Sequence, residues 1–211
     1  MTNAQTKKKF DTHTLTEAAI MVALATVLSF IKVYEAPFGG SVTLLSMAPI
    51  IILSLHRGVG VGLAGGLVYS VLQLIFGLQN IAWVPDLLGK FLCVVLDYII
   101  PFTLLGLGGM FRKVKFTENE RTNVAVQAFL GALVVTLIRY LCHILSGVVV
   151  WYSLDLEWYA DDPSHIVNKY SALPFSAIYN GGFMIPEIIE TCIGVPIIAA
   201  VVKRHVKKDA K

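Results

Sequence analysis

The sequence is poor in charged residues and lacks the common catalytic motifs. Asp, Glu, Lys and Arg make up 15% of its 211 residues, against about 25% in soluble domains. No GxxxxGK[ST] phosphate-binding loop occurs, so the chain is not expected to hydrolyse ATP. No GxSxG motif occurs either. Asp86 and Asp97 would lie about 16 Å apart on one helix, too far for a catalytic carboxylate pair. We therefore expect no enzyme.

Cysteine and histidine are too scattered to indicate a metal site. Cys93, Cys142 and Cys192 lie inside apolar runs without paired or metal-ligand spacing, so they are expected to pack as small hydrophobic residues. The five histidines form no HxxxH pair. We predict neither a metal nor a cofactor.

Long hydrophobic runs are abundant. Hydrophobic residues make up 56% of the chain, and the mean hydropathy is +0.71. Such a composition indicates an all-α membrane protein, since a span needs about 20 apolar residues. The predicted single domain, 1–211, is a bundle of six transmembrane helices with tails at 1–14 and 203–211. The six charge-poor windows are Leu15–Val33, Ser41–Leu55, Val59–Gly77, Asp86–Phe111, Thr122–Trp151 and Leu173–Val202. The second window is short and could be tilted or partly re-entrant.

The distribution of basic residues predicts that both termini are cytoplasmic. In that orientation most of the 17 Lys and Arg residues fall in inside segments, including Arg57, the stretch 112–121 and the C-terminal tail. The acidic cluster at 155–162 falls outside. Positive-inside bias therefore favours this topology.

Small residues recur at spacings that let helices approach closely. Gly58, Gly62 and Gly66 precede or enter the third window, and Gly106 and Gly109 lie in the fourth. Ordinary packing inside the bundle explains these glycines. Ala19 and Ala23 in the first window could instead contact another protein. No internal repeat is found, so an inverted-repeat carrier gains no support.

Ionisable residues inside predicted spans are costly and therefore informative. Arg139 and Glu187 lie at similar depths, roughly 27 Å and roughly 24 Å from the inner ends of their helices. We predict a buried ion pair between them, with Arg139–Asp97 as the alternative. The full set of such residues is Asp97, Arg139, His143, Glu187 and Glu190.

A second group of side chains converges on the outer half of three predicted helices. His143 and Trp151 are eight residues apart and lie on roughly one helix face. A carboxylate, aromatic faces and neutral hydrogen-bonding groups together suit a flat, nitrogen-rich organic cation. This group comprises Asp97, Tyr98, His143, Trp151, Tyr179 and Asn180.

Several stretches of sequence resemble one known family. In order along the chain they are TEAAIMVA at 16–23, GGSV at 39–42, LSLHRG at 53–58, LDY at 96–98, RYLCHILSG at 139–147 and YN at 179–180. With these motifs the chain resembles the thiamine-specific S components of energy-coupling factor (ECF) transporters, also called the YuaJ thiamine transporters. The resemblance extends over nearly the full length.

The resemblance implies a multi-pass protein of the bacterial plasma membrane that binds thiamine with high affinity. It also implies partners, namely a transmembrane T component and two cytoplasmic ATPases. The substrate-binding residues that it implies are Asp97, Tyr98, His143, Trp151, Phe175, Tyr179 and Asn180. The small-residue docking motif falls on Ala19 and Ala23. Asp97 stands where some members have the longer Glu, and Phe175 where some have Tyr.

Two alternative functions stay open at this point. The chain could be an S component for another heterocyclic vitamin or a thiamine precursor. It could also be a self-standing, proton-coupled thiamine carrier, in which Asp97, Arg139, His143 and Glu187 would form a proton relay.

Overall fold

The computed structural model describes residues 11–37 and 39–202, so most of the two predicted tails lies outside the described residues. The first half contains α1 (Thr12–Ser29), a hairpin of β1 (Lys32–Glu35) and β2 (Ser41–Thr43), α2 (Ala48–Arg57), α3 (Val59–Phe76) and α4 (Leu78–Ala82). One long helix follows, made of α5 (Leu87–Cys93), π-helical η1 (Val94–Ile99), α6 (Ile100–Thr103) and 3₁₀-helical η2 (Leu104–Gly109).

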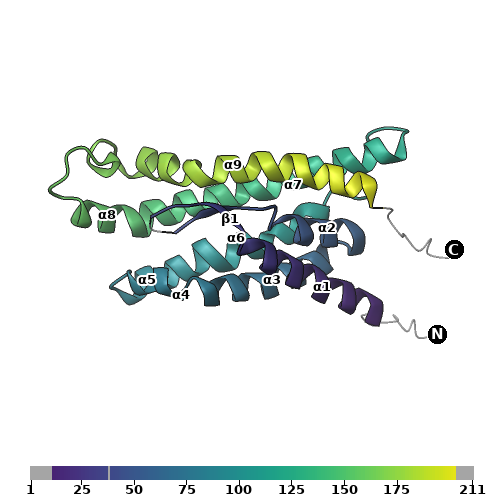
Figure 1. The fold of residues 1–211 in the computed structure, drawn as a ribbon, viewed down its shortest axis with the longest axis horizontal. Coiled ribbons are helices and arrows are strands. Elements are labelled where there is room, and N and C mark those ends of the chain that lie inside the picture. The colour runs from purple at the N-terminus through teal and green to yellow at the C-terminus, as the bar shows by residue number, and fades with distance from the viewer. Residues whose placement is uncertain (1–10, 38, 203–211) are drawn as a thin grey trace, which may run out of the picture.

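The second half is dominated by two long helices that run side by side (Figure 1). The first consists of α7 (Glu120–Ser146), π-helical η3 (Gly147–Trp151) and α8 (Tyr152–Trp158). After the short 3₁₀ turn η4 (Ile166–Asn168), the chain returns along α9 (Ala172–Val201). The start of α1 and the end of α9 lie at one end of the elongated bundle, and α8 lies at the other (Figure 1).

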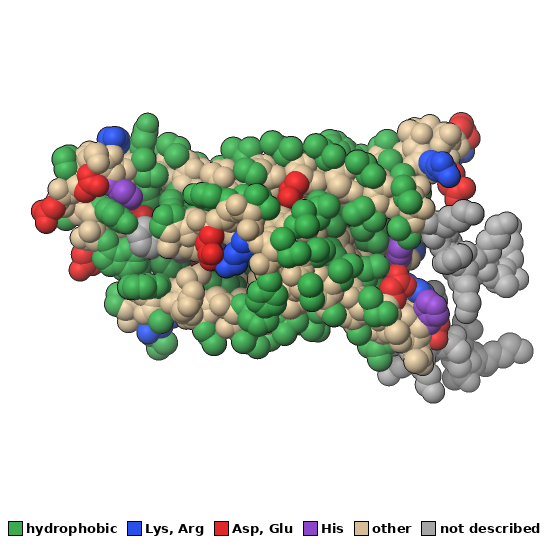
Figure 2. Space-filling model, viewed as in Figure 1, with side chains coloured by type: hydrophobic (Ala, Val, Ile, Leu, Met, Phe, Trp, Pro, Cys, Tyr) green, Lys and Arg blue, Asp and Glu red, His purple; other side chains and the backbone are tan. Residues whose placement is uncertain are grey.

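Five of the six predicted spans are confirmed as helices. Within the described ranges, five helical stretches are long and apolar enough to cross a membrane: Thr12–Ser29, Val59–Phe76, Leu87–Gly109, Glu120–Trp158 and Ala172–Val201. Figure 2 shows apolar side chains over most of the middle of one face and charged ones mainly near its two ends. The fold is therefore that of a multi-pass helical membrane protein.

The second predicted window, Ser41–Leu55, is helical only in its later part and is short, as its length indicated. Ser41–Thr43 pairs with β1 in an antiparallel hairpin, and the helix begins only at Ala48. The 10 residues of α2 extend about 15 Å, roughly half of the hydrocarbon core of a bilayer. Hydropathy could not reveal this difference, because every residue from Ala48 to Leu55 is buried inside the protein.

Glycines allow α2 and its neighbours to pack closely at the centre of the bundle. The Ser54 hydroxyl donates to the Gly106 carbonyl at 2.5 Å and accepts from the Gly109 N–H at 2.9 Å. A Cβ at Gly106 would collide with the backbone of Gly62, and one at Gly131 with the backbone of Gly108. The predicted packing role of the small residues in the third and fourth windows is thus confirmed.

Replacing Gly131 with Ala is expected to destabilise the bundle, because its Cβ meets a backbone carbonyl that cannot rotate away. The expected cost is about 1–3 kcal/mol, the usual range for overpacking. Gly182→Ala is the matched control, since a Cβ there meets nothing within 4 Å. The measurement is thermal unfolding in detergent. Equal melting temperatures for the two variants would contradict this account of the packing.

Candidate functional site

A cavity of about 250 Å³ lies between the β hairpin and helices α3, α4, α7 and α9, with η1 and η3 also on its wall. Its volume is near the lower end of the range for small-molecule sites, about 300–1,000 Å³. The structure brings all seven predicted binding residues to this wall: Asp97, Tyr98, His143, Trp151, Phe175, Tyr179 and Asn180.

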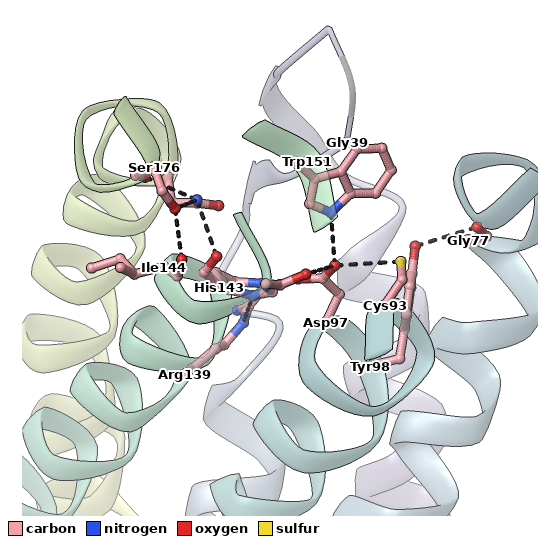
Figure 3. A network of polar contacts seen from close by, with 12 residues as sticks. Gly39, Gly77, Cys93, Asp97, Tyr98, Arg139, His143, Ile144, Trp151 and Ser176 are labelled. Atoms are coloured by element: carbon pink, nitrogen blue, oxygen red, sulfur yellow. Dashed lines mark hydrogen bonds and ion pairs between the residues drawn. The ribbon is translucent and has the colours of Figure 1, made fainter. Parts of the chain in front are cut away.

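The carboxylate of Asp97 is the centre of the polar contacts in the cavity (Figure 3). Its Oδ2 accepts from the Ser146 hydroxyl at 2.6 Å and from the Trp151 indole N–H at 3.0 Å. The Cys93 thiol approaches the same oxygen at 3.4 Å. Oδ1 lies 3.0 Å from Nδ1 of His143. One carboxylate thus fixes side chains from two separate long helices.

The partners of His143 define which of its ring nitrogens carries the hydrogen. Arg139 Nε donates to His143 Nε2 at 3.3 Å, so Nε2 is the acceptor. A neutral ring must then carry its hydrogen on Nδ1, which donates to Asp97. The imidazole therefore connects the guanidinium to the carboxylate without a charge of its own.

Two π-helical turns aim Asp97 and Trp151 at each other. In η3 the Tyr152 N–H donates to the Gly147 carbonyl five residues earlier. On a regular α-helix, eight residues would rotate Trp151 about 80° past the face of His143. The wider π turn takes up one additional residue and brings the indole back toward that face. The predicted convergence of these two side chains is confirmed, but regular helix geometry alone would not produce it.

Pro101 explains the π turn that carries Asp97. Proline has no N–H, so it cannot donate to the carbonyl of Asp97 four residues earlier. Just before the proline, the Ile100 N–H donates to the carbonyl of Val95, five residues earlier, and not to that of Leu96, four residues earlier. A proline four positions after an acidic residue in a span is the one sequence signal that could have indicated this irregularity.

Asn180 and a row of aromatic rings form the opposite side of the cavity. The Asn180 amide nitrogen donates to the His143 carbonyl at 3.2 Å and to the Ser176 carbonyl at 2.9 Å. Phe175 stacks on Tyr179 with ring centroids 6.1 Å apart. The Tyr179 hydroxyl donates to the Gly39 carbonyl at 3.3 Å, which links this side to the β hairpin.

The predicted ion pair between Arg139 and Glu187 is confirmed. Arg139 pairs with Glu187 and not with Asp97, the alternative partner. Arg139 Nη1 lies 3.6 Å from Glu187 Oε2, and the Glu187 side chain is fully buried. The guanidinium also lies 4.6 Å from the centre of the Phe102 ring. A buried charge needs such compensation, because removal from water is costly.

The same ion pair ties the hairpin to α9. Glu187 Oε1 accepts from the Thr43 N–H at 2.5 Å and from the Thr43 hydroxyl at 2.8 Å. One turn further along α9, Glu190 accepts from the Leu45 N–H at 3.1 Å. Both carboxylates therefore satisfy backbone groups where β2 leads into α2.

Comparison with known proteins identifies the family. The profile described as "Thiamine transporter protein (Thia_YuaJ)" matches residues 15–207. The chain belongs to this thiamine transporter family.

Relatives in the thiamine transporter family match over most of their length. The thiamine transporter ThiT of Bacillus subtilis is 30% identical and covers 92% of this chain and 94% of its own. The thiamine transporter ThiT of Lacticaseibacillus paracasei is 28% identical and covers 92% of this chain and 91% of its own. A solved structure of ThiT from Listeria monocytogenes has a TM-score of 0.66 at 24% identity, covering 89% of this chain and 93% of its own. The last similarity supports the fold.

The structure also places at this site of the thiamine transporter family member three residues that the sequence analysis did not predict. Ser146 belongs to the motif at 139–147 and lies three residues after His143, yet its hydrogen bond to Asp97 was not predicted. Phe183 forms an edge contact with His143 at 5.7 Å between centroids. Asp155 also lines the cavity, although its sequence neighbours suggest only an exposed acidic loop.

Glu187→Gln is expected to destabilise the protein by about 3–5 kcal/mol, because it leaves the buried Arg139 cation without its counterion. Adding Arg139→Met should recover part of this loss. Thermal unfolding in detergent measures both. Glu35→Gln is the control, since it breaks the exposed Lys32–Glu35 pair, worth about 0–1 kcal/mol. If the stability lost by the double variant equals the sum of the losses in Glu187→Gln and Arg139→Met alone, the two residues are not coupled as described.

Proposed function

We propose that this chain binds thiamine in the cavity around Asp97 and acts as the substrate-binding S component of an ECF-type transporter. The observation that carries the proposal is the Asp97 carboxylate with the Trp151 indole held 3.0 Å from it. Membership of the thiamine transporter family supports thiamine uptake as the function. Thiamine is a cationic thiazolium joined to an aminopyrimidine, so its two rings make different demands on the site.

The thiazolium would be bound by charge and by aromatic contact. An aromatic face attracts a cation, with a contribution of about 2 kcal/mol or more when the contact is desolvated. The indole N–H of Trp151 already donates to Asp97, so the ring is fixed before a ligand arrives. A ring stacked on Trp151 would carry its positive charge close to the Asp97 carboxylate. Tyr98, whose hydroxyl donates to the Gly77 carbonyl at 3.3 Å, closes the adjacent wall.

The aminopyrimidine would be bound by neutral groups. Asn180 uses its amide nitrogen on the His143 and Ser176 backbone, so its amide oxygen is the atom positioned to accept from an exocyclic amine. The ring of His143, whose two nitrogens already contact Arg139 and Asp97, would form part of the wall on the same side. Phe175 and Tyr179 would pack on the faces of the ring, and Phe175 would do so without the hydroxyl that some family members have.

Asp97, His143, Arg139 and Glu187 contact one another in series. These are the four residues that would form the proton relay if the chain were a self-standing, proton-coupled carrier. Arg139 lies in the middle of this series. A guanidinium stays protonated at physiological pH and cannot pass a proton on. The series is therefore better suited to positioning than to proton conduction, and we favour the S component.

Transport would need partners that supply energy, because the chain has no ATP-binding motif. Ala19 and Ala23 are exposed on α1, whereas Val22 and Ala25 pack against the bundle. We propose that a transmembrane T component packs over these two alanines, and that two cytoplasmic ATPases drive the assembly. Close approach over small residues is a common form of helix association in membranes.

We further propose six membrane elements, with α2 as the short buried one, and cytoplasmic termini. Arg57, at the end of α2, and the basic stretch 112–121, which leads from η2 into the first turn of α7, would then lie inside. The acidic residues at 155–162 would lie outside. This assignment follows the positive-inside rule and opens the cavity toward the external medium.

Thiamine is expected to quench tryptophan fluorescence of the purified chain in a saturable manner, because it would stack on Trp151. Asp97→Asn should weaken binding by about 100-fold or more, since it leaves a desolvated cation without a counterion. Trp151→Ala should remove most of the quenching. Trp83→Phe is the control, because the Trp83 side chain is 63% exposed. A folded wild-type protein that binds pyrithiamine or riboflavin but not thiamine would identify a different heterocycle as substrate.

Ala19→Leu with Ala23→Leu is expected to abolish thiamine uptake in cells while leaving thiamine binding by the purified chain unchanged. Large side chains there would block close helix contact but do not reach the cavity. Val27→Leu, at another exposed position on α1, is the matched control. The measurement is uptake of labelled thiamine together with co-purification of the ATPases. Normal uptake by the double variant would refute docking at this position.

A further inference from the structure

Asp155 is a further carboxylate on the cavity wall, and the site described so far does not use it. It lies on α8, four residues after Trp151, and lines the same cavity. The residue is only 3% exposed. Its Oδ1 is fully buried and has no hydrogen-bond partner among the residues that the structure describes. A buried, unpaired carboxylate oxygen is costly unless a ligand supplies a donor.

The other charged groups on the cavity wall are already compensated. Lys32 pairs with Glu35 at 2.5 Å, and Arg139 pairs with Glu187 at 3.6 Å. Asp97 accepts from four side chains. Asp155 therefore adds a negative charge to the wall beyond the one that Asp97 would use on the cationic ring.

The position of Asp155 indicates which part of the ligand it meets. Four residues along a helix correspond to about 6 Å, and α8 lies at the end of the bundle away from the start of α1 (Figure 1). If the thiazolium stacks on Trp151, its hydroxyethyl arm can extend one helical turn further, to the level of Asp155. The hydroxyl of that arm is the remaining hydrogen-bond donor of thiamine once the exocyclic amine faces Asn180.

We propose that Asp155 accepts a hydrogen bond from the hydroxyl of the hydroxyethyl arm and thereby selects unphosphorylated thiamine over its phosphate esters. This inference rests on the proposed function. A phosphate monoester carries about −1.5 to −2 charge at pH 7, so it places negative charge against a desolvated carboxylate and removes the donor. Selectivity of this kind depends on repulsion of the competitor as well as on attraction of the substrate.

The test compares three ligands on the detergent-purified full chain: thiamine, thiamine monophosphate and deoxythiamine, in which hydrogen replaces the hydroxyl. Wild-type protein should bind thiamine about 10- to 100-fold more tightly than deoxythiamine, the range for a hydrogen bond to a charged group. Asp155→Asn should reduce that ratio at least 10-fold. The same variant should bind thiamine monophosphate more tightly, relative to thiamine, than wild type does.

Asp162→Asn is the matched control, because it removes the same charge from the exposed segment after α8, where Asp162 accepts from Ser164. It should leave both ratios unchanged. Saturable thiamine binding by Asp155→Asn shows that the variant folds. Equal ratios in wild type and Asp155→Asn would overturn the role of Asp155 and leave the proposed function standing. Absence of thiamine binding by the folded wild type would overturn the proposed function itself.

Discussion

The arrangement of the cavity depends on one carboxylate placed inside an apolar bundle. Asp97 has four hydrogen-bonding neighbours, and three of them come from the helix formed by α7 and η3. Each contact offsets part of the cost of taking the charge out of water. In return the carboxylate fixes the orientation of an imidazole, a hydroxyl and an indole. The site is therefore rigid on this side before any ligand enters, which reduces the ordering cost of binding.

A second buried carboxylate organises the region next to it. Glu187 compensates Arg139 and also accepts from the backbone and side chain of Thr43. Through Arg139 it is in contact with His143, and through Thr43 with the β hairpin. The hairpin and the Asp97 cluster thus share one set of polar contacts. A change in one group therefore affects the other, because members of a buried polar network depend on each other for their partners.

The sequence was sufficient to predict the parts of the structure that depend on hydropathy and on the pairing of buried charges. The five long helices follow from apolar runs, and the Arg139–Glu187 pair follows from depth and the rule that buried charges are compensated. The hairpin at the start of the second window was missed, because an apolar stretch at 41–55 has the same hydropathy whether lipid or protein surrounds it. The two π turns were missed because no periodicity marks them. Asp155 was missed because its burial depends on which face of α8, the continuation of α7 and η3, is turned toward the cavity.

The π turn at η3 has a consequence for how relatives of this chain can vary. A wide turn accommodates one more residue than an α-helical turn, so the residues beyond it keep nearly the facing that they would have on a regular helix with one residue fewer. A single-residue deletion between His143 and Trp151 would therefore restore a regular helix and leave the facing of α8 nearly unchanged. Such a relative could still present its stacking ring on the face of the histidine. An alignment gap of one residue in this stretch thus marks the loss of the π turn while the ring keeps its side of the pocket.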